Sequence, residues 1–390
     1  MLKAIPKKFV VFFVVCMLCG SVVGRPIRIG LFNASQVRGL VISAYNGPLI
    51  VSADGRELFV IAEGSAVYAI LSDGKILVSD TNGFVGAFVR LSVQGSGNDA
   101  VVRLKPVNPK SAARNYEEIV SLYADVDRIK LVNLIDEERY TAGVVEAEVG
   151  RGKASEFYKA KAVICRTYLY GHINRHESEG FHLCDETHCQ AYKGQSRDAV
   201  IKPAVADTRE IILTDRENTK PILAAYHSNC GGETESAKNA WQSDLPYLIP
   251  VADPYCASQP NARWEKTISL DDWLKYLIKN GFVPDPATVT DFGFQQLRRI
   301  ADYRVNSFTL PVKKIRGDWQ LRSSFFDVSV EDENIVIRGK GYGHGAGLCQ
   351  EGAMEMGRRG HKYDAIIGFY YKYVNLVPVS SLQIDIPIIE

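Results

Sequence analysis

The sequence predicts an α+β protein in which a small all-β domain precedes a mixed α/β domain. Hairpin-type turn dipeptides recur between short apolar runs in the first third of the chain. From Arg114 onward the pattern changes to strand-like and helix-like segments that follow one another. With 390 residues, of which 46% are apolar, the chain is long enough for two domains of ordinary size.

Residues 1–24 resemble an export signal. Three lysines (Lys3, Lys7 and Lys8) precede an apolar stretch from Phe9 to Leu18, and Val22 and Gly24 offer a cleavage site with small residues. The apolar stretch is shorter than the roughly 20 residues that a membrane span needs. We expect an exported protein, periplasmic or extracellular; the alternative is that the N-terminus stays uncleaved as a membrane anchor.

Residues 25–113 are predicted to form the small β-rich domain. Short apolar runs alternate there with dipeptides that favour tight hairpins, because Asn, Asp and Gly tolerate positive φ angles. No cluster of catalytic residue types is found in this part. The dipeptides are Asn46-Gly47, Asp54-Gly55, Asp73-Gly74 and Asn82-Gly83.

Residues 114–390 are predicted to form the mixed α/β domain. We expect Thr141 to cap a short helix that Gly150 ends, and Ser155 to cap a longer helix that runs to about Asn174. Residues 257–320 have the least regular pattern, and a glycine-rich loop and two helices finish the chain. The remaining predicted elements are strands at Ile129–Leu134, Glu210–Leu213 and Ile222–His227, a helix at Leu270–Lys279, and a hairpin of Phe325–Val330 with Ile335–Arg338.

The charge balance argues against a nucleic-acid partner. Without residues 1–24, which hold three lysines and no acids, 43 basic residues face 45 acidic ones, a net charge of −2. Binding to nucleic acid calls for a basic face. Six cysteines remain after that segment, and in an oxidising compartment the sequence cannot choose among their pairings.

Two acids lie close together in the helix that Gly150 is expected to end. Glu146 and Glu148 are two positions apart, which places them about 200° apart around a helix axis. Only one of them can therefore face a substrate. The alternative is that both are ordinary solvated acids at a helix end.

A second cluster combines thiols and imidazoles. His182, Cys184, His188 and Cys189 lie within eight residues, and zinc prefers four nitrogen and sulfur ligands. Adjacent His188 and Cys189 are expected to have difficulty binding one ion together, so His176 or His182 is the candidate third ligand. A disulfide that uses Cys184 or Cys189 is the alternative.

Two later segments are rich in polar groups or glycine. Tyr226–Glu235 follows a strand-like run and offers hydroxyl and amide groups that can hydrogen-bond a sugar, or it is a polar turn. In Gly339–Gln350, glycines let the backbone approach a ligand closely, next to a helix N-terminus. A peptidase dyad of Cys349 with His344, or of Cys189 with His227, lacks an evident third group.

Taken in order, these segments resemble the family of stage II sporulation protein D and LytB. The resemblance covers Arg114 to Val379. Val149 and Cys349 depart from the Met and Ser that are usual at these places. The matching segments are Asn133, Glu138 and Tyr140, Gly143–Glu148 (GVVxxE), Lys159–Tyr168, Cys189–Gly194, Tyr226–Glu235, Trp241 with Pro246–Leu248, Leu321–Phe326, and Gly343–Ala353.

The resemblance implies a lytic transglycosylase that cuts peptidoglycan glycan strands, with Glu148 as the general acid and base. It implies a partner of glycan strands, denuded of stem peptides in the sporulation member, and a structural zinc ion at His176, Cys184 and Cys189, with His182 or His188 as alternatives to His176. The chemistry itself requires no cofactor. The rival is a non-catalytic wall-binding protein that recruits or stimulates a cell-wall amidase; a metallopeptidase is a more distant one. The residues expected to line the site are Tyr140, Arg166, Gln190, Tyr226, Ser228, His344 and Gln350.

Overall fold

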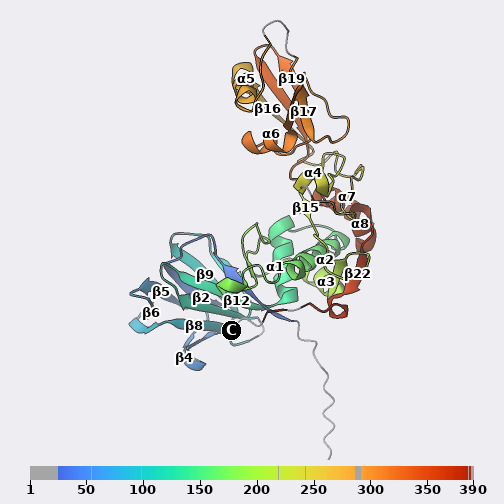
Figure 1. Ribbon diagram of the computed structural model, residues 1–390. Coiled ribbons are helices and arrows are strands. Elements are labelled where there is room, and N and C mark those ends of the chain that lie inside the picture. The colour runs from blue at the N-terminus through green and yellow to red at the C-terminus, as the bar shows by residue number, and fades with distance from the viewer. Residues whose placement is uncertain are drawn as a thin grey trace, which may run out of the picture.

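The computed structural model describes residues 25–387, apart from residues 54, 98, 218, 242, 286–290 and 385. The predicted export signal, residues 1–24, lies outside the described residues. Within them, no helix combines the length and the apolar character needed to cross a bilayer. The architecture confirms the predicted fold class, since a sheet-rich N-terminal region precedes a mixed α/β region (Figure 1).

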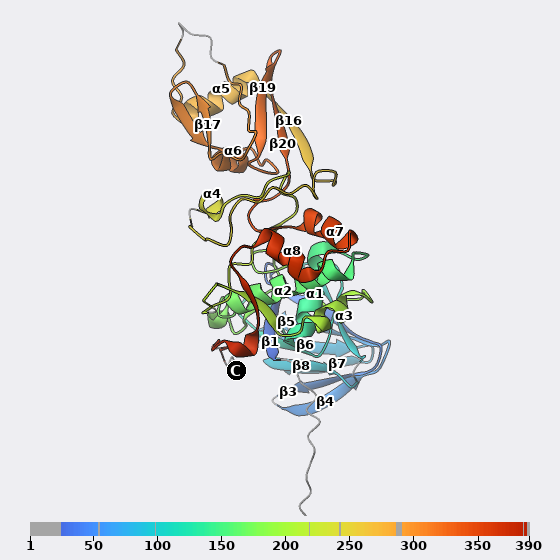
Figure 2. The same cartoon turned by 90° about the vertical axis from the view of Figure 1, so that its right-hand side faces the viewer.

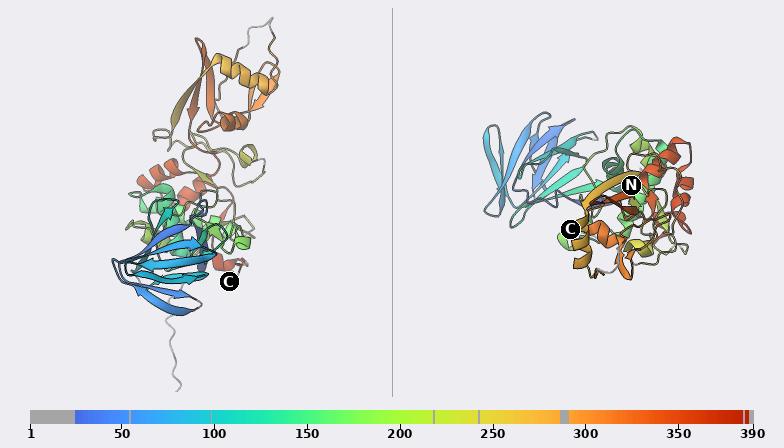
Figure 3. Two further views of the ribbon diagram at one scale, coloured as in Figure 1. Left: turned by 90° about the vertical axis from the view of Figure 1, so that its left-hand side faces the viewer. Right: turned by 90° about the horizontal axis from the view of Figure 1, so that it is seen from above.

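The N-terminal region consists of two mainly antiparallel sheets around a shared core. One sheet has the strand order β13-β1-β12-β11-β8-β3-β4, and the other has β10-β9-β2-β5-β6-β7. Figure 3 shows these sheets lying to one side of the helices. The strands are β1 (Pro26–Leu31), β2 (Gly39–Tyr45), β3 (Leu49–Ala53), β4 (Arg56–Ile61), β5 (Ala66–Ser72), β6 (Lys75–Asp80), β7 (Gly83–Phe88), β8 (Arg90–Gly95), β9 (Val101–Asn108), β10 (Arg114–Tyr116), β11 (Ile119–Ala124), β12 (Ile129–Asp136) and β13 (Leu183–Cys184).

The hairpin turns follow the predicted dipeptides. Asp73 and Gly74 both have positive φ, 50° and 69°, and connect β5 to β6 with Ser72 paired to Lys75. This is the geometry of a two-residue turn that matches the twist of the strands. The sheets continue past residue 113, because β10 pairs with β9 and β12 pairs with β1. Strands of the second predicted domain therefore complete the sheets of the first.

Two helices follow β12 directly. Helix α1 (Glu137–Val149) is capped by Asp136, whose carboxylate accepts from the N–H groups of Glu138 and Arg139. The prediction that Thr141 caps this helix is wrong: its hydroxyl donates to the Glu137 carbonyl inside the helix. Gly150 ends the helix as predicted, with a φ of 70°. Helix α2 (Ser155–Gly171) begins after Ala154, and Ser155 makes no capping hydrogen bond.

The C-terminal helices cover α2. Figure 2 shows α7 (Gln350–Arg358) and α8 (Tyr363–Tyr370) beside α1 and α2, and both contact α2. The strand predicted at Ile222–His227 shortens to two residues, β15, which pairs in parallel with β21. The other elements here are α3 (Ile201–Asp207), β14 (Ile211–Thr214), β15 (Tyr226–His227), α4 (Ala237–Trp241), β21 (Leu348–Cys349), β22 (Asn375–Pro378) and the short 3-10 turns Glu177–Glu179 and Val379–Ser381.

Residues 263–340 form a lobe with a core of its own. Trp273, on helix α5 (Leu270–Lys279), is fully buried at the centre of this core. The predicted helix and the predicted hairpin are both confirmed, and the hairpin turns at Asp332 with a φ of 53°. The lobe also holds β16 (Arg263–Ser269), β17 (Asp302–Val305), β18 (Phe308–Pro311), α6 (Val312–Asp318), β19 (Phe326–Glu331) and β20 (Asn334–Lys340) (Figure 1).

Candidate functional site

The two acids at the end of α1 have separate environments. Glu146 accepts hydrogen bonds from the Ser196 hydroxyl and from the backbone N–H groups of Arg197 and Asp198, at 2.6–3.1 Å. Burial alone would raise the pKa of Glu146, but these hydrogen bonds and the one from Arg151 lower it. Glu146 is therefore an ionised structural acid, and Glu148 is the acid that these donors do not reach.

Glu148 is half-buried one residue before the end of α1. Its Oε1 accepts a hydrogen bond of 2.8 Å from the backbone N–H of Ala191. It also interacts with Tyr226: burial raises the pKa of the Tyr226 hydroxyl well above its ordinary value, and the charge of Glu148 and a hydrogen bond to it act in the same direction. Three distant segments thus meet at this carboxylate: α1, the 189–191 loop and β15.

Lys161 is a further member of the site that the sequence reasoning did not single out. Its Nζ lies 2.8 Å from the centre of the Tyr226 ring and makes no hydrogen bond to the described protein atoms. Burial lowers the pKa of this lysine, while the nearby charges of Cys165 and Glu148 raise it. The sequence did contain a signal for Lys161. It is the second lysine of α2, and it interrupts the apolar face of this helix one turn before Cys165.

The predicted residues Tyr140 and Gln190 do not reach the surface. Both are fully buried. The Gln190 amide donates to the Cys165 carbonyl at 3.2 Å, while its Oε1 and the Tyr140 hydroxyl lack partners among the described residues. Buried polar groups are seldom left unsatisfied, and those that are concentrate at functional sites.

The glycine-rich loop brings His344 to Tyr226. Strand β21 runs so close to β15 that a Cβ on Gly347 would meet the Ala225 carbonyl oxygen at 2.0 Å, so this place requires glycine. His344 Nε2 donates to the Tyr226 carbonyl at 2.9 Å, since its Nδ1 accepts from the Ala346 N–H at 3.1 Å. The ring of Trp241 packs on His344, with centroids 4.8 Å apart.

We expect the stability of the fold to fall as His344 takes up a proton. Burial lowers the pKa of His344 to about 4, although the hydrogen bond to Tyr226 opposes this; Arg316 and Arg299 lower it further, and the His227 ring lies nearby. An unfolded histidine has a pKa of about 6.5. The stabilisation is therefore complete above pH 6.5 and is lost as the pH falls toward 4, by about 1–2 kcal/mol between pH 7 and pH 5.

Urea unfolding at pH 7 and pH 5 tests this for the wild type and for His344→Gln. The glutamine amide can still donate to the Tyr226 carbonyl but does not titrate. The wild type should lose about 1–2 kcal/mol more than the variant over this interval. Equal losses in both proteins would contradict the assignment.

Ser228 and Gln350 were also predicted to line the site. Ser228 directly follows β15, and Gln350 directly follows β21. The Ser228 hydroxyl accepts from the Asn261 amide at 3.2 Å. Gln350 begins α7, is half-buried, and makes no side-chain hydrogen bond within the described chain. Its amide is therefore available to a ligand.

Arg166 lies away from Glu148. The structure gives it a structural role and not the predicted contact with a substrate. Its side chain is fully buried and pairs with Glu138 at 2.5 Å. Its remaining donors bind the carbonyl oxygens of Val205, Thr208 and Ile211. It lies five residues after Lys161, about 140° around α2, and so faces away from Glu148.

The cysteine–histidine cluster forms a compact group of ligand atoms. His176, Cys184, His188 and Cys189 each place one ligand atom within 4.8 Å of the others. Cys189 Sγ lies 3.3 Å from His176 Nε2, and Cys184 Sγ lies 3.5 Å from His188 Nε2. His188 and Cys189 thus do face one point, contrary to expectation. His182 is outside the group, because its Nδ1 accepts from Arg28 N–H and its Nε2 donates to Pro387.

This group is suited to a zinc ion. Two sulfur and two nitrogen donors are the set that zinc prefers, and neither cysteine is in a disulfide. Glu179 lies 2.5 Å from His176 Nδ1, which is the second hydrogen bond typical of histidine ligands to zinc. Cys189 is two residues before Ala191, whose N–H contacts Glu148.

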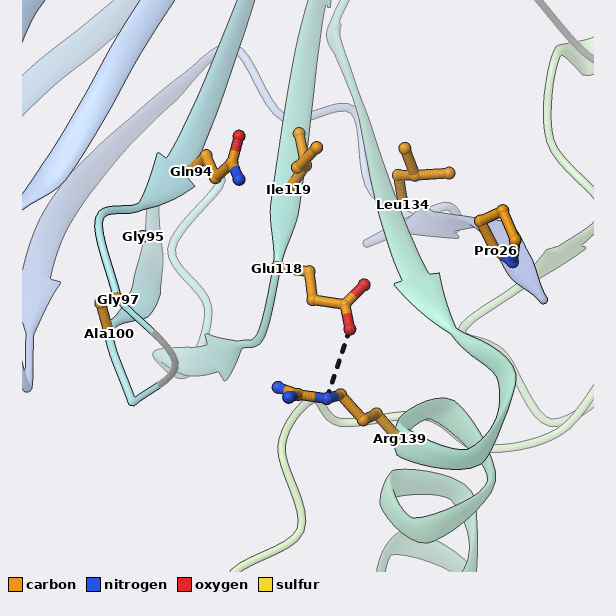
Figure 4. A pocket seen from close by; sticks show the side chains of 9 residues that line it. All are labelled: Pro26, Gln94, Gly95, Gly97, Ala100, Glu118, Ile119, Leu134 and Arg139. Carbon is orange, nitrogen blue, oxygen red and sulfur yellow. Dashed lines mark ion pairs between the residues drawn. The ribbon is translucent and has the colours of Figure 1, made fainter. Parts of the chain in front are cut away.

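A pocket also lies at the other end of α1. Figure 4 shows it between the sheet and the helix, with Glu118 paired to Arg139 at 3.3 Å. Arg139 and Glu148 are nine residues apart, which is about 14 Å along a helix. This pocket is therefore separate from the site of Glu148.

Comparison with known proteins gives similarities over the same segments. A family model described as "Stage II sporulation protein" matches residues 125–214, which contain α1, α2 and the cysteine–histidine group. The chain is 30% identical over 252 residues to stage II sporulation protein D of Bacillus subtilis (strain 168), covering 60% of this chain and 72% of that protein. The protein of the same name in Bacillus amyloliquefaciens is 30% identical over 263 residues, covering 63% and 75%. The amidase enhancer of Bacillus subtilis (strain 168) is 26% identical over 282 residues, covering 59% and 39%.

Proposed function

The chain belongs to the family of stage II sporulation protein D, and on this basis we propose that it acts on peptidoglycan as a lytic transglycosylase. In this proposal it cleaves the β-1,4 bond between N-acetylmuramic acid and N-acetylglucosamine in glycan strands, and it does so outside the cytoplasm. Glu148 is the general acid and base.

The observation that supports this proposal most is the environment of Glu148. Of the two acids at the end of α1, Glu146 is occupied by three donors of the 196–198 segment, whereas Glu148 has one backbone donor and Tyr226. The usual glycosidase scheme uses two carboxylates. A reaction with an internal nucleophile needs only one, because the substrate supplies the second group at high effective concentration.

In the proposed reaction, protonated Glu148 gives its proton to the glycosidic oxygen. The bond between C1 of the muramic residue and this oxygen breaks, and the bonding electrons stay on the oxygen, which becomes the free 4-hydroxyl of the leaving sugar. The 6-hydroxyl of the muramic residue attacks its own C1, and its proton passes to the Glu148 carboxylate. The acid is thereby restored, no water is consumed, and the product has a 1,6-anhydro end.

Other residues of the site are suited to hold the sugar chain. Tyr226 and the Ala191 N–H fix the orientation of the Glu148 carboxylate. The Gln350 amide and the Ser228 hydroxyl offer polar contacts. Trp241, 37% exposed, presents an aromatic face beside His344 on which a sugar ring can pack.

Product analysis tests the proposal. Purified glycan strands, with and without stem peptides, are incubated with the wild-type protein, and the products are identified by mass spectrometry. We expect fragments with 1,6-anhydromuramic ends. Reducing ends formed with uptake of water would indicate a hydrolase instead.

The second candidate is a wall-binding protein that stimulates an amidase. The similarity to an amidase enhancer favours it. It predicts that the protein binds intact strands without cutting them and raises the rate at which an added cell-wall amidase releases stem peptides. The same incubation, followed by a pull-down of the strands, distinguishes the two functions.

We further propose that His176, Cys184, His188 and Cys189 hold a structural zinc ion. When bound, the ion cross-links the 176–189 segment and takes part in no step of the reaction. The chain's own Ala191 N–H remains the group that contacts Glu148. A firmly held 184–189 loop keeps this donor in place.

Replacing Cys184 by Ala should therefore lower the melting temperature and the rate of glycan cleavage together, with a loss of one zinc equivalent per chain. His182→Gln is the matched control, since His182 lies next to the group but binds Arg28 and Pro387. Calorimetry, metal analysis and cleavage assays provide the readouts. A variant that stays as stable as the wild type but loses all activity would point to a catalytic ion.

A further inference from the structure

A second group of potential metal ligands lies outside the site described above. Cys230 follows β15, Asp253 and Cys256 lie in the loop after α4, and Cys349 ends β21. Their ligand atoms all lie within 4.8 Å of one another, and each of the four residues is at most 1% exposed. Three segments distant in the sequence thus bring three thiols and a carboxylate to one point in the core.

The spacing suits an ion better than a covalent bond. Cys230 Sγ lies 3.3 Å from Cys256 Sγ and 3.2 Å from Asp253 Oδ2. A disulfide requires about 2.05 Å between sulfurs. Ligands around tetrahedral zinc, with Zn–S bonds of about 2.3 Å, lie about 3.8 Å apart. The distance between the two sulfurs is therefore closer to the spacing of zinc ligands than to a disulfide bond.

Backbone N–H groups are directed at one of the sulfur atoms, that of Cys349. Cys349 Sγ accepts from the N–H of Cys230 at 3.3 Å and from that of Gly352, in the first turn of α7, at 3.4 Å. Such donors, and the N-terminus of a helix, favour the thiolate form that binds metals.

The carboxylate of Asp253 supports the same reading. Its Oδ2 accepts from the Tyr370 hydroxyl at 2.9 Å and its Oδ1 accepts from the Tyr255 N–H at 2.8 Å, which fixes its orientation. Among the described residues it has no ion-pair partner, although a buried carboxylate without a positive neighbour is costly. A disulfide between two of the cysteines would leave the third thiol unpaired and the charge of this carboxylate uncompensated. A cation would bind all four groups.

We propose that Cys230, Asp253, Cys256 and Cys349 bind a second, structural zinc ion in a closed four-ligand site. Binding replaces the protons of the three thiols, which pass to solvent. The ion would join the end of β15 to the start of α7. Since β15 carries Tyr226, which contacts Glu148, the ion would also help to position Tyr226; only this consequence rests on the proposed function.

Metal analysis combined with native mass spectrometry tests the proposal on the full chain, purified without chelators. Cys256→Ala should lose one zinc equivalent relative to the wild type, and Cys256→Ala with Cys184→Ala should lose one more than Cys184→Ala alone. Cys165→Ala is the control, because Cys165 is buried but belongs to neither group. An unchanged zinc content in Cys256→Ala would overturn the proposal.

A second measurement uses the wild type alone, in case the variants fail to fold. Alkylation without a reductant, followed by peptide mass spectrometry, should leave Cys230, Cys256 and Cys349 unmodified until a chelator is added and should then label all three. A disulfide between Cys230 and Cys256 would overturn the proposal. Neither measurement depends on glycan cleavage, so a failure of the proposed enzyme activity would be seen separately.

Discussion

Replacing Glu148 by Gln is expected to abolish the formation of 1,6-anhydro ends while the protein stays folded. A glutamine retains an oxygen that accepts from the Ala191 N–H, so the local structure is kept. It cannot deliver a proton to the glycosidic oxygen. Loss of a positioned general acid lowers rates by about 10²–10⁴-fold, and here one group serves as both acid and base. Mass spectrometry of products from purified glycan strands measures the effect.

Glu146→Gln is the matched control for this variant. It is the same change two residues earlier on the same helix, but Glu146 faces the 196–198 segment. We expect near-normal cleavage per folded molecule and a loss of about 1–3 kcal/mol in unfolding free energy, because charge-assisted hydrogen bonds are weakened. Wild-type turnover by Glu148→Gln, or loss of turnover only in Glu146→Gln, would contradict the assignment of the acid.

Replacing Arg166 by Met is expected to give the largest loss of stability. The change leaves the Glu138 carboxylate without its cation and takes the guanidinium donor from three carbonyl oxygens around a fully buried side chain, although two of these oxygens keep backbone donors. Removing one partner of a buried ion pair costs about 3–5 kcal/mol. Urea unfolding at pH 7 measures this cost. At temperatures where the variant is folded, KM for glycan strands should be unchanged, since Arg166 does not reach the site of Glu148.

Lys159→Met provides the comparison on the same helix. Lys159 pairs with Glu156 and Asp207 near the surface, and such pairs contribute about 0–1 kcal/mol. A small loss in Lys159→Met beside a large one in Arg166→Met would support the structural role. If Arg166→Met were as stable as the wild type but raised KM, the original prediction of a substrate contact would be restored.

Local patterns in the sequence predicted much of the fold. The Asp73-Gly74 turn, the end of α1 at Gly150, the helix at Leu270–Lys279 and the C-terminal hairpin all follow from interactions between residues close in sequence. Helix starts were less predictable. Thr141 and Ser155 are residue types that favour caps, but Asp136 begins α1 one turn earlier because β12 ends there.

In the candidate site, too, local patterns predicted some features, and only the tertiary structure could decide the others. The helical phase of Glu146 and Glu148 established that only one acid could face a substrate, but it could not say which one. That choice depends on the 196–198 segment reaching Glu146 and on Ala191 and Tyr226 reaching Glu148. Similarly, Arg166 and Lys161 both lie on α2, and only the packing around the helix shows that Lys161 faces Glu148 whereas Arg166 does not.

By itself the sequence determined the fold class, the family and the short list of reactive residues, because these depend on periodicity, turn chemistry and ordered motifs along the chain. The tertiary structure alone decided which of those residues meet. His188 joins Cys189 through the fold of the 176–189 loop, and Cys230, Asp253, Cys256 and Cys349 converge from three segments. The physical reason is that contacts between distant segments depend on how whole elements pack, and no local spacing in the sequence encodes that packing.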